Sequence, residues 1–402
     1  MEAELYHSDQ SGTAGPLCLY CFVCSRVRHA FSCVVSCEAF DSLQSFNRNT
    51  ARLSGKAVRE MNQAGQILGI SPGAGIPGGE VAIDCSGLDT TDPSRCAAWF
   101  NGERAAIVAL GSKRVVAIVP EQKGGPSTEV CVESGGARSP SVSFTTGKKL
   151  ADDVHPVANP AFDPDDGALF VTRSGSRGER LPVSLFRIDS AGEVSEYSGD
   201  ITNPTAIVFD PEGQMFVSSR LDGTIYRVTP FREAIPFARG LGVATGVAFD
   251  RDGTMYVGDR GGTIYKVNGI GEEKAWAQLE PSVSAYHLAF GPDEALYVTG
   301  PTVSSFDSIH RVDKDGKVGS FFKGLGRPQG LAFDREGNLY VTASLRGRRG
   351  VVRISPDGVE AEVFLAGMNL VGLAFSSTGE LAVASNDSVY SVPLGIEGVL
   401  LS

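Results

Sequence analysis

Cysteine is absent from the last two thirds of this 402-residue chain, since all eight cysteines lie at or before Cys131. Disulfides therefore cannot hold most of the fold together. Basic residues are also scarce: 36 Lys and Arg face 47 Asp and Glu, giving a net charge of −11. This balance argues against nucleic acid and anionic lipid as partners, because both are bound through clustered Lys and Arg. No apolar run approaches the roughly 20 residues that a membrane helix needs, so no membrane span is expected.

The composition that remains is that of a loop-rich globular protein. Hydrophobic residues make up 42% of the chain, beside 49 Gly and 21 Pro. At roughly 100–200 residues per domain, this length predicts two or three folding units.

The first 60 residues read as an unstructured leader, or as upstream sequence from a misassigned start with Met61 as the natural beginning. Five cysteines (Cys18, Cys21, Cys24, Cys33 and Cys37) could alternatively form a zinc or iron–sulfur site, although no small metal domain surrounds them. The segment lacks the basic start, apolar run and cleavage site of a signal peptide. A cytoplasmic location is therefore the default expectation, with an envelope or secreted location left open.

One phrase recurs six times after Leu150. It consists of small or apolar residues, a Phe, an acidic turn with Gly, and an alternating apolar strand, as in AFDRDGTMYV at Ala248. Successive anchoring phenylalanines are 47, 40, 41, 43 and 42 residues apart, at Phe162, Phe209, Phe249, Phe290, Phe333 and Phe375. Each repeat reads as four short strands, and a period near 42 predicts a six-bladed β-propeller over 150–402. We expect each Phe to pack between blades and each Asp-x-x-Gly to form a turn.

The segment 65–147 precedes this propeller and contains short strands rich in Val and Ile, separated by turn residues. This pattern predicts a small β-sandwich, so the expected fold is all-β with two domains. Cys85 and Cys96 flank a loop in it and could pair if oxidised, whereas a reducing cytosol predicts free thiols.

Both parts resemble known families. Ile70-Ser-Pro72, Gly78-Gly79-Glu-Val81, Trp99-Phe-Asn-Gly102 and Val119-Pro120 are similar, in this order, to IPT/TIG domains, which are immunoglobulin-like sandwiches. The repeats resemble six-bladed NHL and gluconolactonase/luciferin-regenerating-enzyme-like propellers of the TolB-like group, through phrases such as Pro328-Gln-Gly-Leu-Ala-Phe-Asp334. Propellers of this shape host lactonases, peptide readers and scaffolds, so the resemblance implies a fold more than a function.

The gluconolactonase resemblance implies a divalent metal, calcium or zinc, held by a Glu, Asn side chains and an Asp at the channel mouth. A hard cation needs several converging oxygen ligands. Here Ala158-Asn-Pro160 stands where the family has its Glu, and Ala343 stands where it has an Asp. Only Asp259 keeps that family carboxylate. A cofactor is therefore not expected unless the chain is a lactonase.

The starts of the inner strands converge on a propeller's channel, and here they carry polar side chains. His287 is the most interesting, either as a catalytic group or as a hydrogen-bonded lining residue. A small polar ligand is predicted to bind at this mouth through Asn159, Thr205, Thr245, Tyr286, His287 and Gln329.

Our interpretation is a non-catalytic binding module for a small polar ligand or a protein or peptide partner. One alternative is a metal-dependent lactonase, and another is a carbohydrate- or envelope-associated binding protein.

Overall fold

The computed structural model describes residues 65–122, 125–304 and 306–399, and almost all regular structure in them is β-strand. A short 3-10 helix at Pro93–Arg95 is the exception within these ranges. The expected all-β fold is therefore confirmed. The predictions for the leader, including its cysteine cluster, lie outside the described residues. No helix in the described ranges is both long enough and apolar enough to span a bilayer.

The first ten strands form two sheets that share one core. The first sheet has the order β1-β3-β7-β6, and β2, β10, β8, β4 and β5 make up the second, with β9 paired to β8. Buried residues of the first sheet, such as Val81 and Val115, pack against Phe100, Val130 and Phe144 of the second. The bounds are β1 Gln66–Ser71, β2 Ala74–Gly75, β3 Glu80–Ser86, β4 Ala97–Phe100, β5 Glu103–Ala105, β6 Ile107–Gly111, β7 Arg114–Ile118, β8 Ser127–Ser134, β9 Ala137–Arg138 and β10 Val142–Thr146.

Three thiols in this region are unpaired. Cys85 and Cys96 are buried, and Cys131 is partly exposed. The Cys85 Sγ donates to the carbonyl of Ile83, and the Cys96 Sγ to that of Asp89. The immunoglobulin-like classification of the sandwich stays a prediction.

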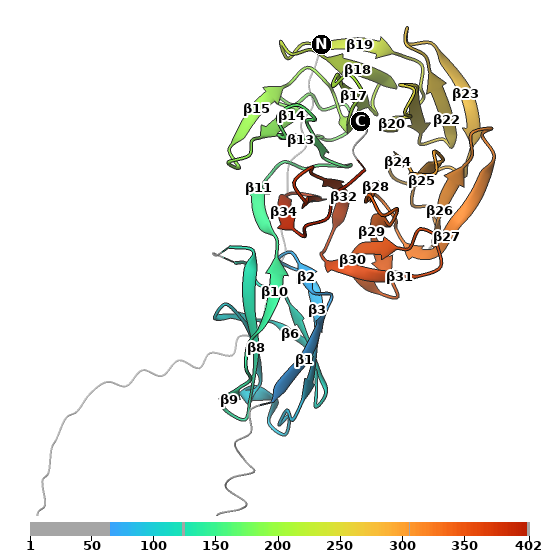
Figure 1. Cartoon of the computed structure of the whole chain (residues 1–402). Helices are drawn as coiled ribbons and strands as arrows, with labels where there is room; N and C mark the ends of the chain where they lie inside the picture. The colour runs from blue at the N-terminus through green and yellow to red at the C-terminus, as the bar shows by residue number, and fades with distance from the viewer. Residues whose placement is uncertain (1–64, 123–124, 305, 400–402) are drawn as a thin grey trace, which may run out of the picture. The chain divides into compact units, whose positions relative to one another are not determined.

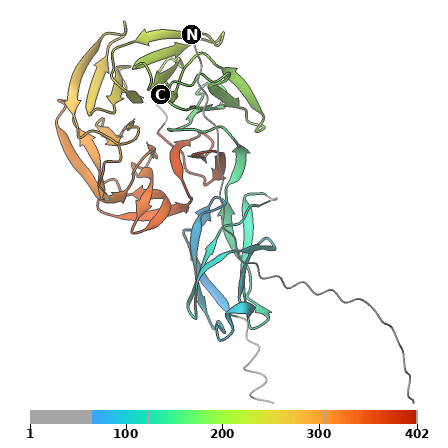
Figure 2. The same ribbon diagram turned by 180° about the vertical axis from the view of Figure 1, so that it is seen from behind.

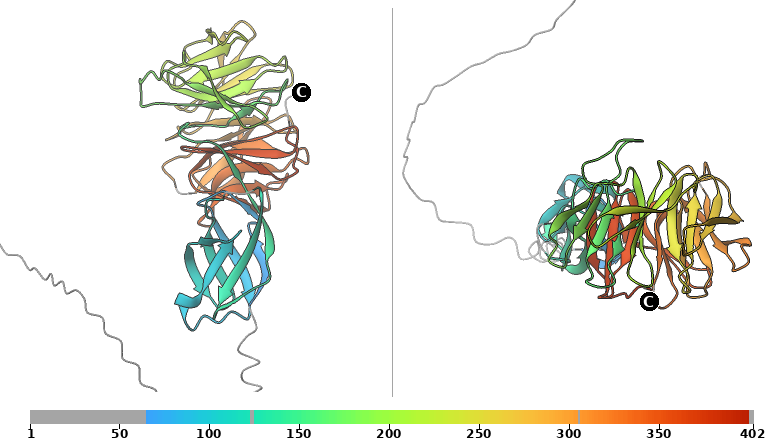
Figure 3. Two further views of the ribbon diagram at one scale, coloured as in Figure 1. Left: turned by 90° about the vertical axis from the view of Figure 1, so that its left-hand side faces the viewer. Right: turned by 90° about the horizontal axis from the view of Figure 1, so that it is seen from above.

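The residues that follow form antiparallel four-stranded units arranged around a common axis (Figure 1), and the same ring is seen from behind in Figure 2 and edge-on in Figure 3. Two neighbouring units are hydrogen-bonded to each other, where Leu325 and Gly326 pair with Leu345 and Ser344. We number these units as blades 1 to 6. Blades 1 to 3 comprise β12 Ala161–Phe162, β13 Leu169–Thr172, β14 Leu185–Ile188, β15 Val194–Ser198; β16 Pro204–Phe209, β17 Met215–Ser219, β18 Thr224–Val228, β19 Ala234–Ala238; and β20 Ala244–Phe249, β21 Met255–Asp259, β22 Thr263–Val267, β23 Glu273–Gln278. Blades 4 and 5 comprise β24 His287–Phe290, β25 Leu296–Thr299, β26 Asp307–Val312, β27 Val318–Gly326; and β28 Leu331–Phe333, β29 Leu339–Leu345, β30 Arg348–Ile354, β31 Ala361–Ala366.

Blade 6 closes the ring with strands from both ends of the repeat region. It combines β32 Leu370–Phe375, β33 Glu380–Ser385 and β34 Val389–Pro393 with β11 Lys148–Ala151, which pairs antiparallel with β34. The inner strands contact one another in sequence order, and β12 of blade 1 returns to β32 of blade 6. Closure of this kind leaves few unpaired strand edges.

The repeated phenylalanines pack between blades, as expected. Five of them meet an aromatic ring on the second strand of the preceding blade, at centroid separations of 4.8–5.9 Å: Phe170–Phe209, Phe216–Phe249, Tyr256–Phe290, Tyr297–Phe333 and Tyr340–Phe375. Edge-to-face or tilted pairs of this kind are favourable beyond the area they bury. At the closing junction the corresponding partner of Phe162 is Ala382, and both belong to one apolar cluster.

The repeated aspartates stabilise turns. Oδ1 of Asp250, for example, accepts the backbone N–H groups of Asp252 and Thr254. Ser376 makes equivalent bonds through its hydroxyl in blade 6. Side-chain acceptors of this type satisfy the backbone donors of a tight turn, so these residues hold the hairpins rather than perform chemistry.

A short strand joins the sandwich to blade 5. Strand β2 pairs in parallel with both β10 and β31, and the Ile76 N–H donates to the carbonyl of Ala366 at 2.9 Å. Arg348, the first residue of β30, donates to the Ser71 carbonyl at this junction. The two parts therefore share backbone hydrogen bonds as well as a covalent connection.

Candidate functional site

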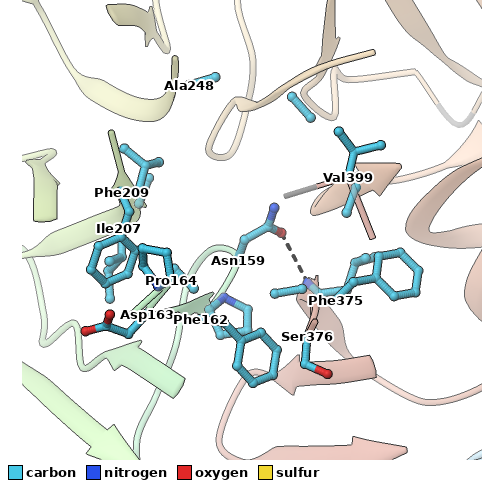
Figure 4. Close-up of a pocket in the computed structure, with 18 of the residues that line it drawn as sticks. Asn159, Phe162, Asp163, Pro164, Ile207, Phe209, Ala248, Phe375, Ser376 and Val399 are labelled. Carbon is cyan, nitrogen blue, oxygen red and sulfur yellow. Dashed lines mark hydrogen bonds between the residues drawn. The ribbon is translucent and has the colours of Figure 1, made fainter. Parts of the chain in front are cut away.

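The inner strands of the propeller enclose a central cavity of about 900 Å³ (Figure 4). All six blades contribute to its wall. The residue immediately before each anchoring Phe lines it and is small or β-branched: Ala161, Val208, Ala248, Ala289, Ala332 and Ala374. Small side chains at these positions leave the space open, and the volume lies within the range of small-molecule sites.

The residue three positions before each anchoring Phe lies toward the end of the cavity where the inner strands begin. Its side chain decides whether that end is polar or apolar. In blade order these residues are Asn159, Ala206, Gly246, His287, Gly330 and Gly372. Only blades 1 and 4 place a polar side chain there, and these two blades lie opposite each other in a six-membered ring. Recognition from these positions therefore falls to Asn159 and His287.

The Asn159 side chain is already engaged with the protein. Its Nδ2 donates to the carbonyl of Leu331 in β28 at 3.0 Å, and its Oδ1 accepts the N–H of Leu373 in β32 at 3.1 Å. Figure 4 shows the side chain directed toward the strand that carries Phe375. Asn159 thus fastens the start of blade 1 to blades 5 and 6.

Two glycines make this crossing possible. A Cβ on Gly330 would lie 2.2 Å from Asn159 Oδ1, and one on Gly372 would lie 2.3 Å from the carbonyl oxygen of Ala158. The Asn159 side chain therefore occupies the room that a side chain would take at Gly330 in blade 5, and the backbone of residues 158 and 159 occupies that room at Gly372 in blade 6.

His287 is the unsatisfied polar group of the cavity wall. The residue is 3% exposed, and its Nε2 has no hydrogen-bond partner among the described residues. Burial lowers the pKa of the imidazole to about 4, so the ring is neutral at pH 7. A buried polar atom without a partner is unfavourable, and its presence at a cavity calls for an explanation.

The other predicted mouth residues are divided between the cavity and the blades. Tyr286 lines the cavity, and its hydroxyl donates to the carbonyl of Glu280. Thr245, Thr205 and Gln329 are not among the residues lining the cavity. The Thr245 hydroxyl accepts the N–H of Tyr286 and donates to the carbonyl of Gly258. Gln329 Nε2 donates to the Leu370 carbonyl at 3.4 Å. The Thr205 hydroxyl is buried and has no partner among the described residues.

Asp259 stabilises a turn. Its Oδ1 accepts the N–H groups of Val243 at 2.8 Å and Gly261 at 3.0 Å. Within the described part of the chain, no three His, Cys, Asp or Glu side chains converge closely enough to hold a metal ion. The residues present therefore do not fit a carboxylate-rich calcium or zinc centre.

The opposite end of the cavity is acidic. Asp163, Asp165, Asp166, Asp210 and Glu380 lie along it, and its lining contains no Lys or Arg. Loss of solvation raises the pKa of Asp163 and of Asp210. Asp166 is neutralised by Arg187 at 2.6 Å. The field at this end disfavours anions.

Sequence reasoning missed this acidic rim and the apolar wall. The signal was present, because an alanine precedes five of the six anchoring phenylalanines and an Asp follows four of them. The sequence pattern predicts packing for the Phe and a turn for the Asp-x-x-Gly and assigns no role to the alanine, although a residue at the inner end of a blade can also line the channel.

No known protein-family model matches the chain, and no curated protein matches it. Many solved structures do. A protein described as a putative gluconolactonase shares 19% identity over 63% of this chain and 93% of its own, with a TM-score of 0.53. A gluconolactonase from Xanthomonas campestris shares 18% identity over 61% of this chain and 88% of its own, with a TM-score of 0.52. These likenesses establish the β-propeller fold and nothing finer.

Proposed function

We propose that the protein is a non-catalytic binding module whose central cavity holds a small, uncharged polar molecule. The observation that carries this proposal is the unpaired Nε2 of His287 in the cavity wall. This atom is itself covered by its neighbours, so a ligand hydroxyl or carbonyl would satisfy it once the ring turns toward the cavity. A satisfied buried group is worth roughly 1–3 kcal/mol more than an orphaned one.

The cavity supports the uncharged class in two ways. Its walls are largely Ala, Val, Leu and Phe side chains, which suit the faces of a ring. Its charged lining residues are all acidic, which disfavours a carboxylate or phosphate inside it. A neutral six-membered ring bearing hydroxyl groups fits both features.

The test compares His287→Leu with His310→Leu. Leucine has a similar volume and no polar atom, and His310 lies in β26, outside the cavity lining. Calorimetric titration would use 1,5-anhydroglucitol as the neutral ring and gluconate as its acidic counterpart. We expect binding of the neutral ring to fall at least tenfold in His287→Leu and to stay unchanged in His310→Leu. Equal binding by all three proteins, or no binding of the neutral ring by any, would overturn the proposal.

The alternative is a metal-dependent gluconolactonase-like hydrolase, a function suggested by the names of two similar folds. It requires a metal set that the described residues do not form, because Asp259 is occupied by two backbone donors. For the sandwich we propose an immunoglobulin-like IPT/TIG domain with a supporting role. A carbohydrate-binding role remains a second candidate for that domain.

A further inference from the structure

Blades 1 to 3 each place an arginine at the same position, 11 residues after the anchoring Phe: Arg173, Arg220 and Arg260. Each directly follows the second strand of its blade. The Arg220 N–H donates to the carbonyl of Asn203, and the Arg260 N–H to that of Val243, just before the inner strands β16 and β20. These arginines therefore lie at the end of the propeller where the inner strands begin, away from the acidic rim.

The three arginines differ in their partners. Arg173 Nη2 is 3.2 Å from Asp153 Oδ2, so its charge is balanced. Neither Arg220 nor Arg260 has a carboxylate within ion-pair distance among the described residues. Arg220 is partly buried, and its Nη2 reaches only the carbonyl of Gly175, at 3.3 Å. An Arg without an anionic partner in such a position leaves most of its five donors unused.

The two unpaired arginines also act on each other. Burial lowers the pKa of Arg220, and the positive charge of Arg260 lowers it further. Like charges placed together without a counter-charge destabilise a fold, unless an anion joins them.

The carboxylates closest in sequence to the two arginines, Asp259 and Asp222, accept hydrogen bonds from other groups, and so does Glu179, which lies beside Gly175. Asp259 accepts the N–H groups of Val243 and Gly261, and Glu179 accepts that of Ser176. Asp222 accepts the Tyr226 hydroxyl at 2.8 Å. A further donor is close in sequence, because the hydroxyl of Ser174, next to Gly175, is buried without a described partner.

We infer that Arg220 and Arg260 form a binding site for an oxyanion, the carboxylate or phosphate group of a small molecule. Guanidinium groups present paired donors that match the oxygens of both groups. This site goes beyond the proposed cavity function, since neither arginine lines the cavity.

The experiment titrates the full chain with inorganic phosphate and, separately, with gluconate, at constant ionic strength. Arg260→Gln is the main variant because its side chain is exposed and can be removed without opening the core. Arg173→Gln is the control, since it occupies the same position in blade 1 but is already paired. We expect affinity for at least one anion to fall tenfold or more in Arg260→Gln and to change less than twofold in Arg173→Gln.

A second readout keeps the test independent of ligand choice. Without added anion, Arg260→Gln should raise the melting temperature, because it relieves the repulsion on Arg220, whereas Arg173→Gln should lower it or leave it unchanged. Binding of phosphate but not gluconate would assign the site to phosphate groups. Binding of gluconate but not phosphate would assign it to carboxylates. Equal anion affinity in all proteins, or no binding of either anion by the wild type, would overturn the inference. His287→Leu should leave anion binding intact, so the two sites fail separately.

Discussion

The buried imidazole of His287 predicts a specific acid sensitivity. Its pKa is about 4 in the folded protein, against 6.5 for an ordinary histidine, and loss of solvation is the cause. Above pH 6.5 the ring is neutral in both the folded and unfolded chains, so it adds no pH dependence. Between pH 6.5 and 4 the unfolded chain binds a proton that the folded chain does not, and stability falls as the pH falls. At roughly 1.4 kcal/mol per pH unit, the total loss is about 3 kcal/mol.

Urea unfolding of the wild type and His287→Leu from pH 7.5 to 4 measures this loss. Other groups titrate in the same range, including His310, whose pKa burial also lowers, but they are common to both proteins and cancel in the difference. The free-energy difference between variant and wild type should grow by about 3 kcal/mol in favour of the variant as the pH falls from 6.5 to 4. A free-energy difference that stays constant over this range would show that burial does not lower the pKa of the His287 imidazole.

Two further variants probe the structure around the cavity, and one thiol measurement probes the core of the sandwich. Asn159→Ala should lower the free energy of unfolding by about 2 kcal/mol, because it leaves one carbonyl of β28 and one N–H of β32 without a partner. Urea denaturation would measure this loss. An unchanged free energy of unfolding would mean that water replaces the amide. Gly372→Ala should lower the free energy of unfolding by about 1–3 kcal/mol, because the new Cβ would collide with the Ala158 carbonyl. Gly319→Ala is the control, since its Cβ would lie 3.7 Å from the nearest heavy atom and should be tolerated. Equal melting temperatures for the two variants would contradict this prediction. The Cys85 thiol, whose pKa burial raises to about 11, should react with a disulfide reagent far more slowly than Cys131 in the folded chain, and equal rates would argue against its burial.

Much of the propeller could be predicted from the sequence because its repeat carries two physical requirements at once. Each blade needs an apolar ring against its neighbour and a turn that satisfies its own backbone, and both appear as residues at fixed spacing. The closing strand was harder to locate, because β11 has no repeat partner in sequence and is defined by its pairing with β34.

The candidate site was only partly predictable. His287 and Asn159 were chosen for their place at the start of an inner strand, yet the two side chains differ in role because of contacts far away in sequence. Asn159 bonds to backbone groups 172 and 214 residues away, which no local pattern reveals. Likewise, the sequence around Arg220 and Arg260 is that of ordinary loop arginines. Only the structure shows that Arg173 is paired with a carboxylate whereas, among the described residues, Arg220 and Arg260 are not.

The measurement that tests the binding-module account most directly is hydrolysis of glucono-1,5-lactone by the purified chain with calcium or zinc added, compared with Asp259→Ala. The account predicts hydrolysis at the uncatalysed background rate for both proteins, together with a modest loss of stability in Asp259→Ala from two lost turn hydrogen bonds. Metal-dependent hydrolysis well above background that disappears in Asp259→Ala would contradict it and establish the lactonase alternative.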